Sequence, residues 1–271
     1  MEMHWILYVL SLLLAGLASG FATGLFGVGG GIVRIPIFLY LFPVFGVHAA
    51  VVMHLAAGTS LALAIPSSLS ASREQYKAGN LDLAFLKTWI PALVIGVVLG
   101  LVIMRYVSSR FLVQVFAFVI LAVSVEMFFT TKDTKLTERV PGGIIRGTIA
   151  FVIGCLSVLV GLTGGSFTTP ALTAFGYPIH RSIAVATAGG FFISVIGAAG
   201  SAVNGFHASG LPEFSFGYID LTSVVVMAPA VLLAAPYGVK LANRLSQDML
   251  RRVFAIFLFI VSLDLLRDLY F

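Results

Sequence analysis

The sequence contains few charged residues and almost no cysteine, and both shortages limit what the protein can be. Charged residues make up 10% of the 271 positions, whereas hydrophobic residues make up 59%. Soluble domains carry about a quarter charged residues, so this composition excludes an ordinary water-soluble fold. Cys155 is the only cysteine, which excludes an internal disulfide and a cysteine-based metal site. We expect no metal ion and no cofactor.

Other absences narrow the class of function further. No G-x-x-x-x-G-K-[ST] pattern is present, which argues against direct use of ATP by this chain. No basic cluster lies beside aromatic residues, so the net charge of +5 does not indicate nucleic-acid binding. No pairing of a nucleophile with a base stands out, and we expect that the protein is not an enzyme.

Long apolar runs dominate what remains. A run of about 18 or more apolar residues is long enough to cross a membrane as a helix. The first run follows Glu2 without a preceding Lys or Arg, so we interpret it as a retained span and not as a signal peptide. The clearest runs are Ile6–Phe26, Phe85–Met104, Phe111–Thr130, Ile144–Leu162 and Ile219–Gly238. The sequence therefore predicts an all-α polytopic membrane protein.

The two halves of the chain resemble each other. The stretch FGVGGGIVRIP (Phe26–Pro36) matches VGLTGGSFTTP (Val160–Pro170) at an offset of 134 residues. Further along, an offset of 138 residues pairs Asp82 with Asp220 and Glu126 with Asp264. We expect an N-terminal repeat over 1–130, a polar linker over 131–143 and a C-terminal repeat over 144–271, joined in one transmembrane domain.

Each repeat is predicted to contain about five segments, and an odd number makes the two repeats inverted. With the N-terminus outside, nearly all cations fall on the cytoplasmic side, and only Arg105, Arg110 and Arg267 fall outside. Arg34 remains within the membrane. Ten crossings with both termini outside account best for this distribution. Whether the short segments 32–45 and 167–176 cross completely stays open.

The glycine runs predict short broken helices at membrane depth. Unpaired backbone is costly in hydrocarbon and is tolerated only where protein or water covers it. The N-terminus of a helix has free N–H groups and a positive dipole end, which favour anions. Arg34 adds a fork of donors suited to an oxyanion, although it could instead snorkel or pair with Glu126 or Asp264. The predicted substrate-binding residues are Gly27, Gly29, Gly30, Gly31, Arg34, Gly164, Gly165, Ser166, Thr168 and Thr169. The alternative is that the glycines only permit close helix packing.

Several other polar residues are candidates for the pathway or for proton coupling. His54 lies well inside a predicted span, where it would relay protons or, alternatively, be a core histidine bonded to a carbonyl. Glu126 and Asp264 lie near the end of the last span of each repeat, where a simple interfacial position is the alternative to proton transfer. The full set is His54, Thr59, Ser60, Asn204, Glu126 and Asp264.

These features resemble the TauE/SafE sulfite exporter family, also called TSUP and formerly DUF81. The resemblance rests on GLFGVGGGIVRIPIFLYLF, on GLTGGSFTTPAL, on the H-x₅-A-x-A-G pattern from His180 and on the two-half layout. It covers essentially the whole chain and implies a permease of a bacterial or archaeal plasma membrane, the inner membrane in bacteria with two membranes. The second run, G-L-T-G-G-S, departs from a full glycine run, which puts its role in question.

The resemblance implies a secondary transporter of small sulfur-containing anions such as sulfite, organosulfonates or thiosulfate. The substrate would bind near the midplane between the two repeats. The alternatives are an anion channel and a permease for a non-sulfur organic anion. The sequence leaves open the exact substrate, import against export, proton coupling and the oligomeric state, with a homodimer as one option.

Overall fold

The computed structural model describes residues 2–26, 30–129, 142–242, 244 and 247–270, and this part of the chain is helical. An isolated bridge between Ser215 and Asp220 is its one strand-like feature. The helices are α1 (Glu2–Phe26), α2 (Gly31–Val44), α3 (Val52–Lys77), α4 (Leu83–Tyr106), α5 (Ser109–Phe129), α6 (Gly143–Leu159), α7 (Gly165–Ala174), α8 (Ile179–Asn204), α9 (Leu221–Ala242) and α10 (Gln247–Tyr270). The predicted all-α fold is confirmed.

The apolar runs form the long helices. In the described part of the chain, α1, α3, α4, α5, α8 and α9 are long and apolar enough to cross a membrane, and α2 and α6 are shorter apolar helices. The short broken helices are also where we predicted them. Helices α2 and α7 end at the caps Phe45 and Phe175. Gly46 and Gly176 follow with φ of 86° and 73°, the left-handed conformation that commonly ends a helix.

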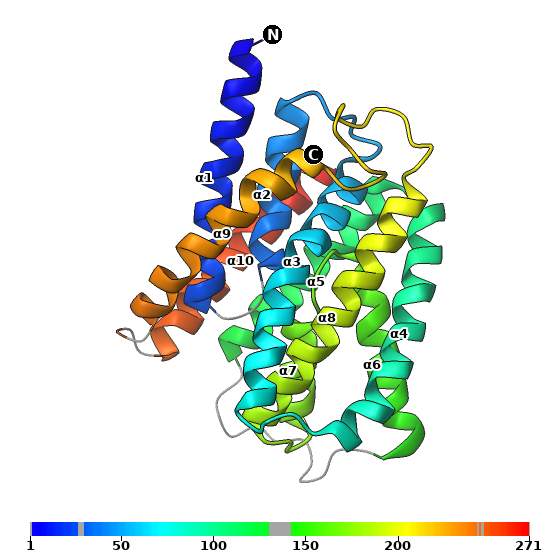
Figure 1. The fold of residues 1–271 in the computed structure, drawn as a ribbon, viewed down its shortest axis with the longest axis vertical. Coiled ribbons are helices and arrows are strands. Elements are labelled where there is room, and N and C mark those ends of the chain that lie inside the picture. The colour runs from blue at the N-terminus through cyan, green and yellow to red at the C-terminus, as the bar shows by residue number, and fades with distance from the viewer. Residues whose placement is uncertain (1, 27–29, 130–141, 243, 245–246, 271) are drawn as a thin grey trace.

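Helices from the two predicted repeats pair with each other (Figure 1). The most extensive contacts join α1 with α9, α4 with α6, α3 with α8 and α5 with α10. Exchanging the first five helices for the last five reproduces the same set of pairs. The duplication of the two halves and their inversion both stay predictions.

Glycines hold two of these pairs together at close range. On the α1–α9 pair they are Gly16, Gly20 and Gly238, and on the α4–α6 pair they are Gly96, Gly100 and Gly154. A Cβ at any of these six positions would lie 2.0–2.8 Å from the partner helix. Small residues let helix backbones approach this closely, which is a main source of packing energy in a membrane. We call these two contacts the glycine seams.

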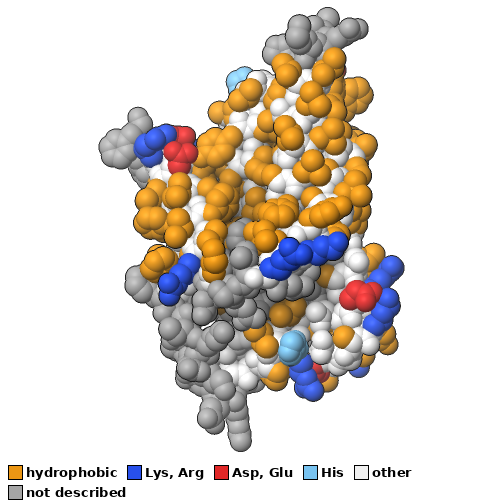
Figure 2. All heavy atoms as spheres, turned by 90° about the vertical axis from the view of Figure 1, so that its left-hand side faces the viewer, with side chains coloured by type: hydrophobic (Ala, Val, Ile, Leu, Met, Phe, Trp, Pro, Cys, Tyr) orange, Lys and Arg blue, Asp and Glu red, His pale blue; other side chains and the backbone are white. Residues whose placement is uncertain are grey.

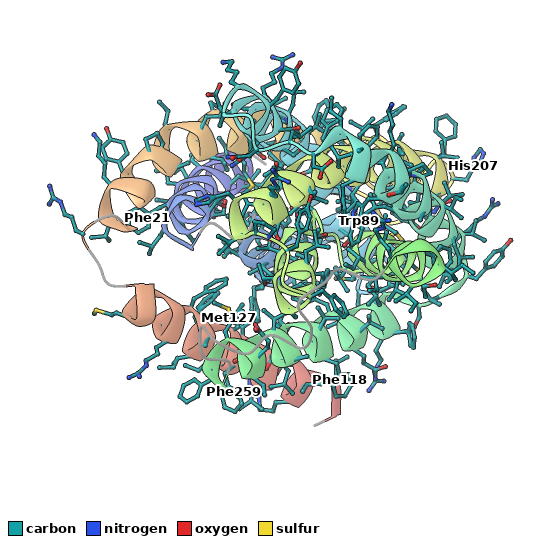
Figure 3. All side chains as sticks on the ribbon, turned by 90° about the horizontal axis from the view of Figure 1, so that it is seen from below. Phe21, Trp89, Phe118, Met127, His207 and Phe259 are labelled. Atoms are coloured by element: carbon teal, nitrogen blue, oxygen red, sulfur yellow. The ribbon has the colours of Figure 1, made fainter. Side chains whose placement is uncertain are left out.

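Helices α3 and α8 form the centre of the molecule. In the most apolar window of α3, 72% of the residues are buried, against 33% in those of α1, α4 and α9. Seen from below, Trp89 lies among the helices, whereas Phe118 and Phe259 lie at the outer edge (Figure 3). The side face is broadly apolar, and most of the Lys and Arg side chains visible there lie in its lower half (Figure 2). The first turn of α1 and the last turn of α10 lie toward the upper end (Figure 1).

Candidate functional site

Two short helices begin at glycines in the interior of the fold. Helix α2 follows Gly30 and α7 follows Gly164, and no side-chain hydrogen bond caps either N-terminus. The carbonyl oxygen of Gly30 accepts the N–H of Arg34 at 2.9 Å, and that of Gly164 accepts the N–H of Thr168 at 2.8 Å. Because a helix cannot satisfy the N–H groups of its own first turn, both N-termini suit an anion. Gly27 and Gly29 of the predicted site lie outside the described residues.

The two glycine breaks contact each other. A Cβ at Gly31 would lie 2.9 Å from the carbonyl oxygen of Gly161 and 3.2 Å from Ser60 Oγ. Ser60 Oγ donates a hydrogen bond to that same carbonyl oxygen at 3.0 Å. Gly161 has a φ of 67°, and a Cβ there would lie 2.6 Å from the Cα of Ala57. The start of α2, the middle of α3 and the break after α6 therefore form one tightly packed junction.

Arg34 is buried directly above the start of its own helix. Its side chain is 2% exposed, and its Nη2 would lie 2.7 Å from a Cβ placed on Gly30. Its Nε has no hydrogen-bond partner in the described part of the chain. An uncompensated buried cation is costly, and in membrane proteins such a group marks a candidate functional site. The guanidinium and the free N–H groups of α2 can together hold an oxyanion.

The predicted residues of α7 line the second N-terminus. Ser166 and Thr168 are buried, whereas Gly165 and Thr169 are half-buried. The carbonyl oxygen of Thr169 accepts the hydroxyl of Thr173 at 2.9 Å, a bond within the helix. A Cβ at Gly165 would meet no described atom within 4 Å. At this position no described atom packs against the start of α7, unlike at the start of α2.

The predicted pathway residues do not gather in one place. His54 Nε2 lies 3.0 Å from the carbonyl oxygen of Met104, the arrangement of a core histidine bonded to a carbonyl. Thr59 Oγ1 accepts the N–H of Asp220 at 2.9 Å, and Asn204 Nδ2 donates to the carbonyl oxygen of Leu101 at 2.9 Å. Of this set, only Ser60 reaches the junction of the glycine breaks. Roles in proton transfer or in the pathway stay predictions.

Neither of the two matched acids, Glu126 and Asp264, has a described contact with Arg34. Asp264 accepts the hydroxyl of Tyr40 at 2.5 Å and forms an ion pair with Arg267 at 3.1 Å. Glu126 is exposed near the end of α5. No ion pair between Arg34 and an acid is found among the described residues. The alternative in which Asp264 neutralises Arg34 therefore has no support in the observed contacts.

Sequence reasoning did not single out one fully buried acid as a site residue. Asp220 is fully buried just before α9, where it accepts the Tyr8 hydroxyl at 2.6 Å and the N–H of Ser223 at 3.0 Å. The hydroxyl of Ser223 also donates to this carboxyl group. Its counterpart Asp82 caps α4 through the N–H of Phe85 at 3.0 Å. The match between Asp82 and Asp220 in the repeat was the available signal for a shared capping role.

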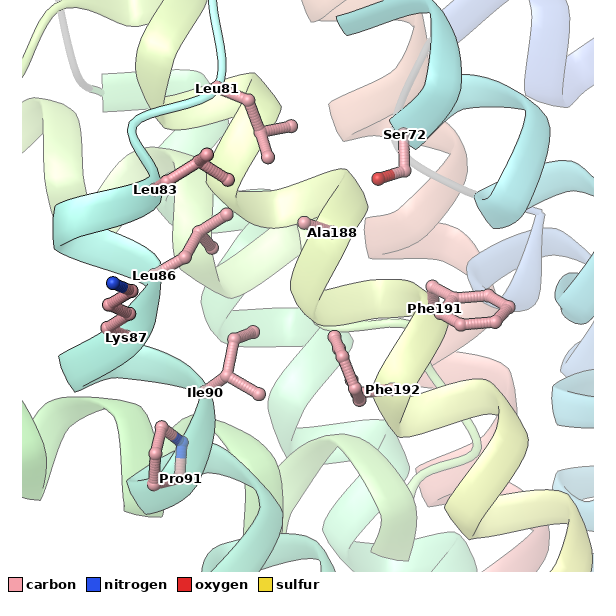
Figure 4. Close-up of a pocket in the computed structure, with 10 residues that line it drawn as sticks. All are labelled: Ser72, Leu81, Leu83, Leu86, Lys87, Ile90, Pro91, Ala188, Phe191 and Phe192. Atoms are coloured by element: carbon pink, nitrogen blue, oxygen red, sulfur yellow. The ribbon is translucent and has the colours of Figure 1, made fainter. Parts of the chain in front are cut away.

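A separate pocket opens near the lower end of the bundle. It has a volume of about 460 Å³ and lies between α3, α4 and α8 (Figure 4). Its walls are apolar apart from Ser72 and Lys87, and it contains none of the predicted substrate-binding residues. No group of three or more His, Cys, Asp or Glu suited to a metal ion occurs in the described ranges.

Comparison with known proteins places this chain in a family. The family model described as "Sulfite exporter TauE/SafE" matches residues 12–265. A probable membrane transporter protein of Haemophilus influenzae is 29% identical over 95% of this chain and 98% of its own length. One from Methanocaldococcus jannaschii is 26% identical over 98% of both chains. The probable membrane transporter protein YunE of Bacillus subtilis is 22% identical over 95% of this chain and 97% of its own. The chain belongs to the TauE/SafE family, a family of multi-pass membrane transporters and not of enzymes.

Proposed function

We propose that this member of the TauE/SafE family is a secondary permease for small sulfur-containing oxyanions, with sulfite and organosulfonates as the leading candidates. The substrate binds where the two glycine breaks meet, at the N-termini of α2 and α7. The name of the family model supplies the sulfur chemistry. The buried guanidinium of Arg34 supplies the positive charge.

Arg34 is the observation that carries this proposal. Its side chain is 2% exposed and its Nε is unpaired, so the folded protein holds a desolvated cation without a described counter-ion. An oxyanion would neutralise that charge, accept the N–H groups of α2 and relieve the desolvation cost. A structural salt bridge would instead have satisfied the guanidinium from within the chain.

The same proposal includes a direction for the chain in the membrane. Both termini lie outside, the halves are inverted repeats, and residues 131–143 link them on the cytoplasmic side. The excess of Lys and Arg on the linker side and the symmetric pairing of helices support this arrangement. A reporter active only in the cytoplasm, fused to the C-terminus, is expected to be inactive, and an active fusion would contradict the orientation.

The experiment compares sulfite binding and flux in the wild type, Arg34→Ala, Arg34→Lys and Gly30→Ala. Arg34→Ala is expected to weaken binding at least about 100-fold, because one charge-assisted bidentate contact is lost. Arg34→Lys keeps the charge but loses the fork, and we expect intermediate binding. Gly30→Ala adds a methyl group within 2.7 Å of Nη2, so it displaces the guanidinium without removing it.

Arg73→Ala is the matched control, because Arg73 is exposed near the end of α3. Wild-type affinity in folded Arg34→Ala would reject the site. Binding of carboxylates in preference to sulfur oxyanions would reject the substrate class. Flux that saturates and shows counterflow is expected of a permease, and linear flux without counterflow would favour an anion channel.

A further inference from the structure

The pocket near the lower end of the bundle is a groove that has α8 as its floor. Helix α8 contacts both α3 and α4, whereas α3 and α4 are not an extensively contacting pair in the described part of the chain. Phe191 and Phe192 of α8 line the pocket between these two helices (Figure 4). Leu83 and Phe192 are also exposed, so the pocket opens on the outer surface of the bundle. Because α3, α4 and α8 are long and apolar enough to cross a membrane, this opening faces lipid. We call the pocket the α8 groove.

One lysine gives the α8 groove a positive charge. The residues of α4 that line it are spaced as one helical face, and they are Leu83, Leu86, Lys87, Ile90 and Pro91. Figure 4 shows Lys87 at the edge of this group, with its amino nitrogen on the side of Leu83, where α4 begins. Side chains on a helix lean toward its N-terminus, which favours this direction. The cation therefore lies toward the end of the groove at which α4 starts.

The charge of Lys87 is not neutralised from within the described part of the chain. The lining contains no acid, and Lys87 forms no ion pair with a described residue. The acids nearest in the sequence have other partners. Asp82 accepts the hydroxyl of Tyr177 at 3.0 Å, and Glu74 pairs with Lys77 at 2.7 Å. The complement of the α8 groove is therefore an anionic group attached to an apolar chain.

The dimensions of the α8 groove suit part of one lipid molecule. Its lining on α4 runs from Leu83 to Pro91, which is about 12 Å along the helix axis. The hydrocarbon of one leaflet is about 15 Å thick. The groove has a volume of about 460 Å³, which lies within the range of small-molecule sites. A free inorganic anion would leave the apolar walls uncovered, and a plain hydrocarbon would leave the lysine unpaired.

We propose that the α8 groove binds one anionic phospholipid. An acyl chain lies on α8 between α3 and α4, and the phosphate lies at Lys87. Basic pockets between membrane helices on the cytoplasmic side bind anionic headgroups, and the orientation proposed above puts Lys87 on that side. The groove contains no residue of the proposed substrate site, so it binds lipid whichever anion the protein transports.

The test measures quenching of Trp89 fluorescence by lipids with brominated acyl chains. The chain has two tryptophans, so Trp5→Phe leaves Trp89 as the single reporter. Trp89 is fully buried on α4 between Leu86 and Ile90, which line the groove. The full-length protein is placed in phosphatidylcholine nanodiscs that contain a small fraction of brominated phosphatidylglycerol. We expect saturable quenching, stronger than with the same fraction of brominated phosphatidylcholine. Equal quenching by the two lipids would overturn the proposal.

Removing the lysine tests the position of the headgroup. Lys87→Ala is expected to lower the preference for phosphatidylglycerol about fivefold, the effect of one lysine near an anionic lipid surface. Lys240→Ala is the matched control, because Lys240 is an exposed lysine in the last turn of α9 and does not line the groove. It should keep the full preference. An unchanged preference in Lys87→Ala, or an equal loss in both variants, would overturn the site.

A second variant fills the α8 groove and leaves its charge in place. Ser72 is half-buried near the end of α3 and lines the groove. Ser72→Phe should fold, because its ring enters the pocket, and should reduce quenching by phosphatidylglycerol. Ala84→Phe is the control, because Ala84 is exposed on α4 and does not line the groove. Undiminished quenching in folded Ser72→Phe would contradict the proposal.

A soluble competitor separates a lipid from a free anion. Inorganic phosphate should not displace brominated phosphatidylglycerol, because the acyl chain holds the lipid in place. Displacement by phosphate would show a site for the headgroup alone and would overturn the acyl-chain groove. Loss of sulfite binding in Arg34→Ala tests only the permease proposal and leaves the lipid site unaffected.

Discussion

The starts of α2 and α7 use the same backbone device and differ in what surrounds it. Both helices begin after glycine and end at a phenylalanine cap. At the start of α2, Gly31 packs on Gly161 and Ser60, and the guanidinium of Arg34 lies beside Gly30. At the start of α7, a Cβ on Gly165 would meet no described atom within 4 Å, and the Ser157 hydroxyl has no hydrogen-bond partner among the described residues. The first helix start therefore carries a buried charge and contacts the other glycine break, whereas no described charge lies at the second.

A second matched pair differs in the same way. Asp82 and Asp220 cap α4 and α9 and each accepts a tyrosine hydroxyl, from Tyr177 at 3.0 Å and from Tyr8 at 2.6 Å. The Asp82 side chain is 30% exposed, whereas Asp220 is fully buried. The two matched positions thus share the capping chemistry, while the burial around them differs. Matching residues of the two halves should respond unequally to the same substitution.

The largest contrast is expected between two glycines of the breaks. Gly161→Ala places a Cβ 2.6 Å from the backbone of Ala57 and forces a left-handed φ on alanine. We expect a loss of about 3 kcal/mol in unfolding free energy from overlap and backbone strain together. Gly165→Ala should stay within about 0.5 kcal/mol of the wild type, since its methyl group would meet no described atom within 4 Å. Equilibrium unfolding in mixed detergent measures both variants. Equal losses of stability would contradict the expected difference between the two glycines.

The next largest contrast is expected in the stability that the two capping acids, Asp220 and Asp82, contribute. Asp220→Ala leaves the Tyr8 hydroxyl and the Ser223 N–H without their acceptor in a fully buried place, and we expect about 2–3 kcal/mol of destabilisation. Asp82→Ala removes a half-exposed cap and should cost about 1 kcal/mol. The same unfolding assay measures both variants. A larger loss of stability in Asp82→Ala would show that burial does not determine how much each acid stabilises the protein.

The smallest expected effect is a change in the stability of the protein at acid pH. The backbone N–H of Phe85, with the Tyr177 hydroxyl and Arg181, holds the pKa of Asp82 below its ordinary value of 3.8, although burial opposes this. The stabilisation is therefore complete above pH 3.8 and is lost as the pH falls through the lower pKa of the folded state. Tyr177→Phe should reduce this acid-dependent loss slightly, because the pKa of Asp82 then rises toward its unfolded value. Unfolding temperatures between pH 3 and 7 measure the difference.

Sequence patterns predicted the helices well because lipid imposes simple rules on length and polarity. Apolar runs located α1, α4, α5, α6 and α9, and the glycine runs located the starts of α2 and α7. The sequence predicted a substrate site between the two repeats, but it did not predict the contact between Gly31 and Gly161. The hydrogen-bond partners of His54 and Thr59 were not predictable, because a polar residue within a span bonds to whichever neighbouring segment lies beside it. Ser157 carried no local signal, since an unpaired hydroxyl is defined by what surrounds it.

The glycine seams also determine which helices can move together as a rigid unit. Each seam joins one helix of the first half to one of the second, α1 to α9 and α4 to α6. A Cβ at Gly96 would lie 2.0 Å from the carbonyl oxygen of Phe151, which leaves little room for sliding. In any rocking motion, each rigid unit would therefore contain helices from both halves of the chain. The polar linker separates the halves in the sequence, yet neither half expressed alone would have its seam partner, and the two fragments should become stable only when produced together.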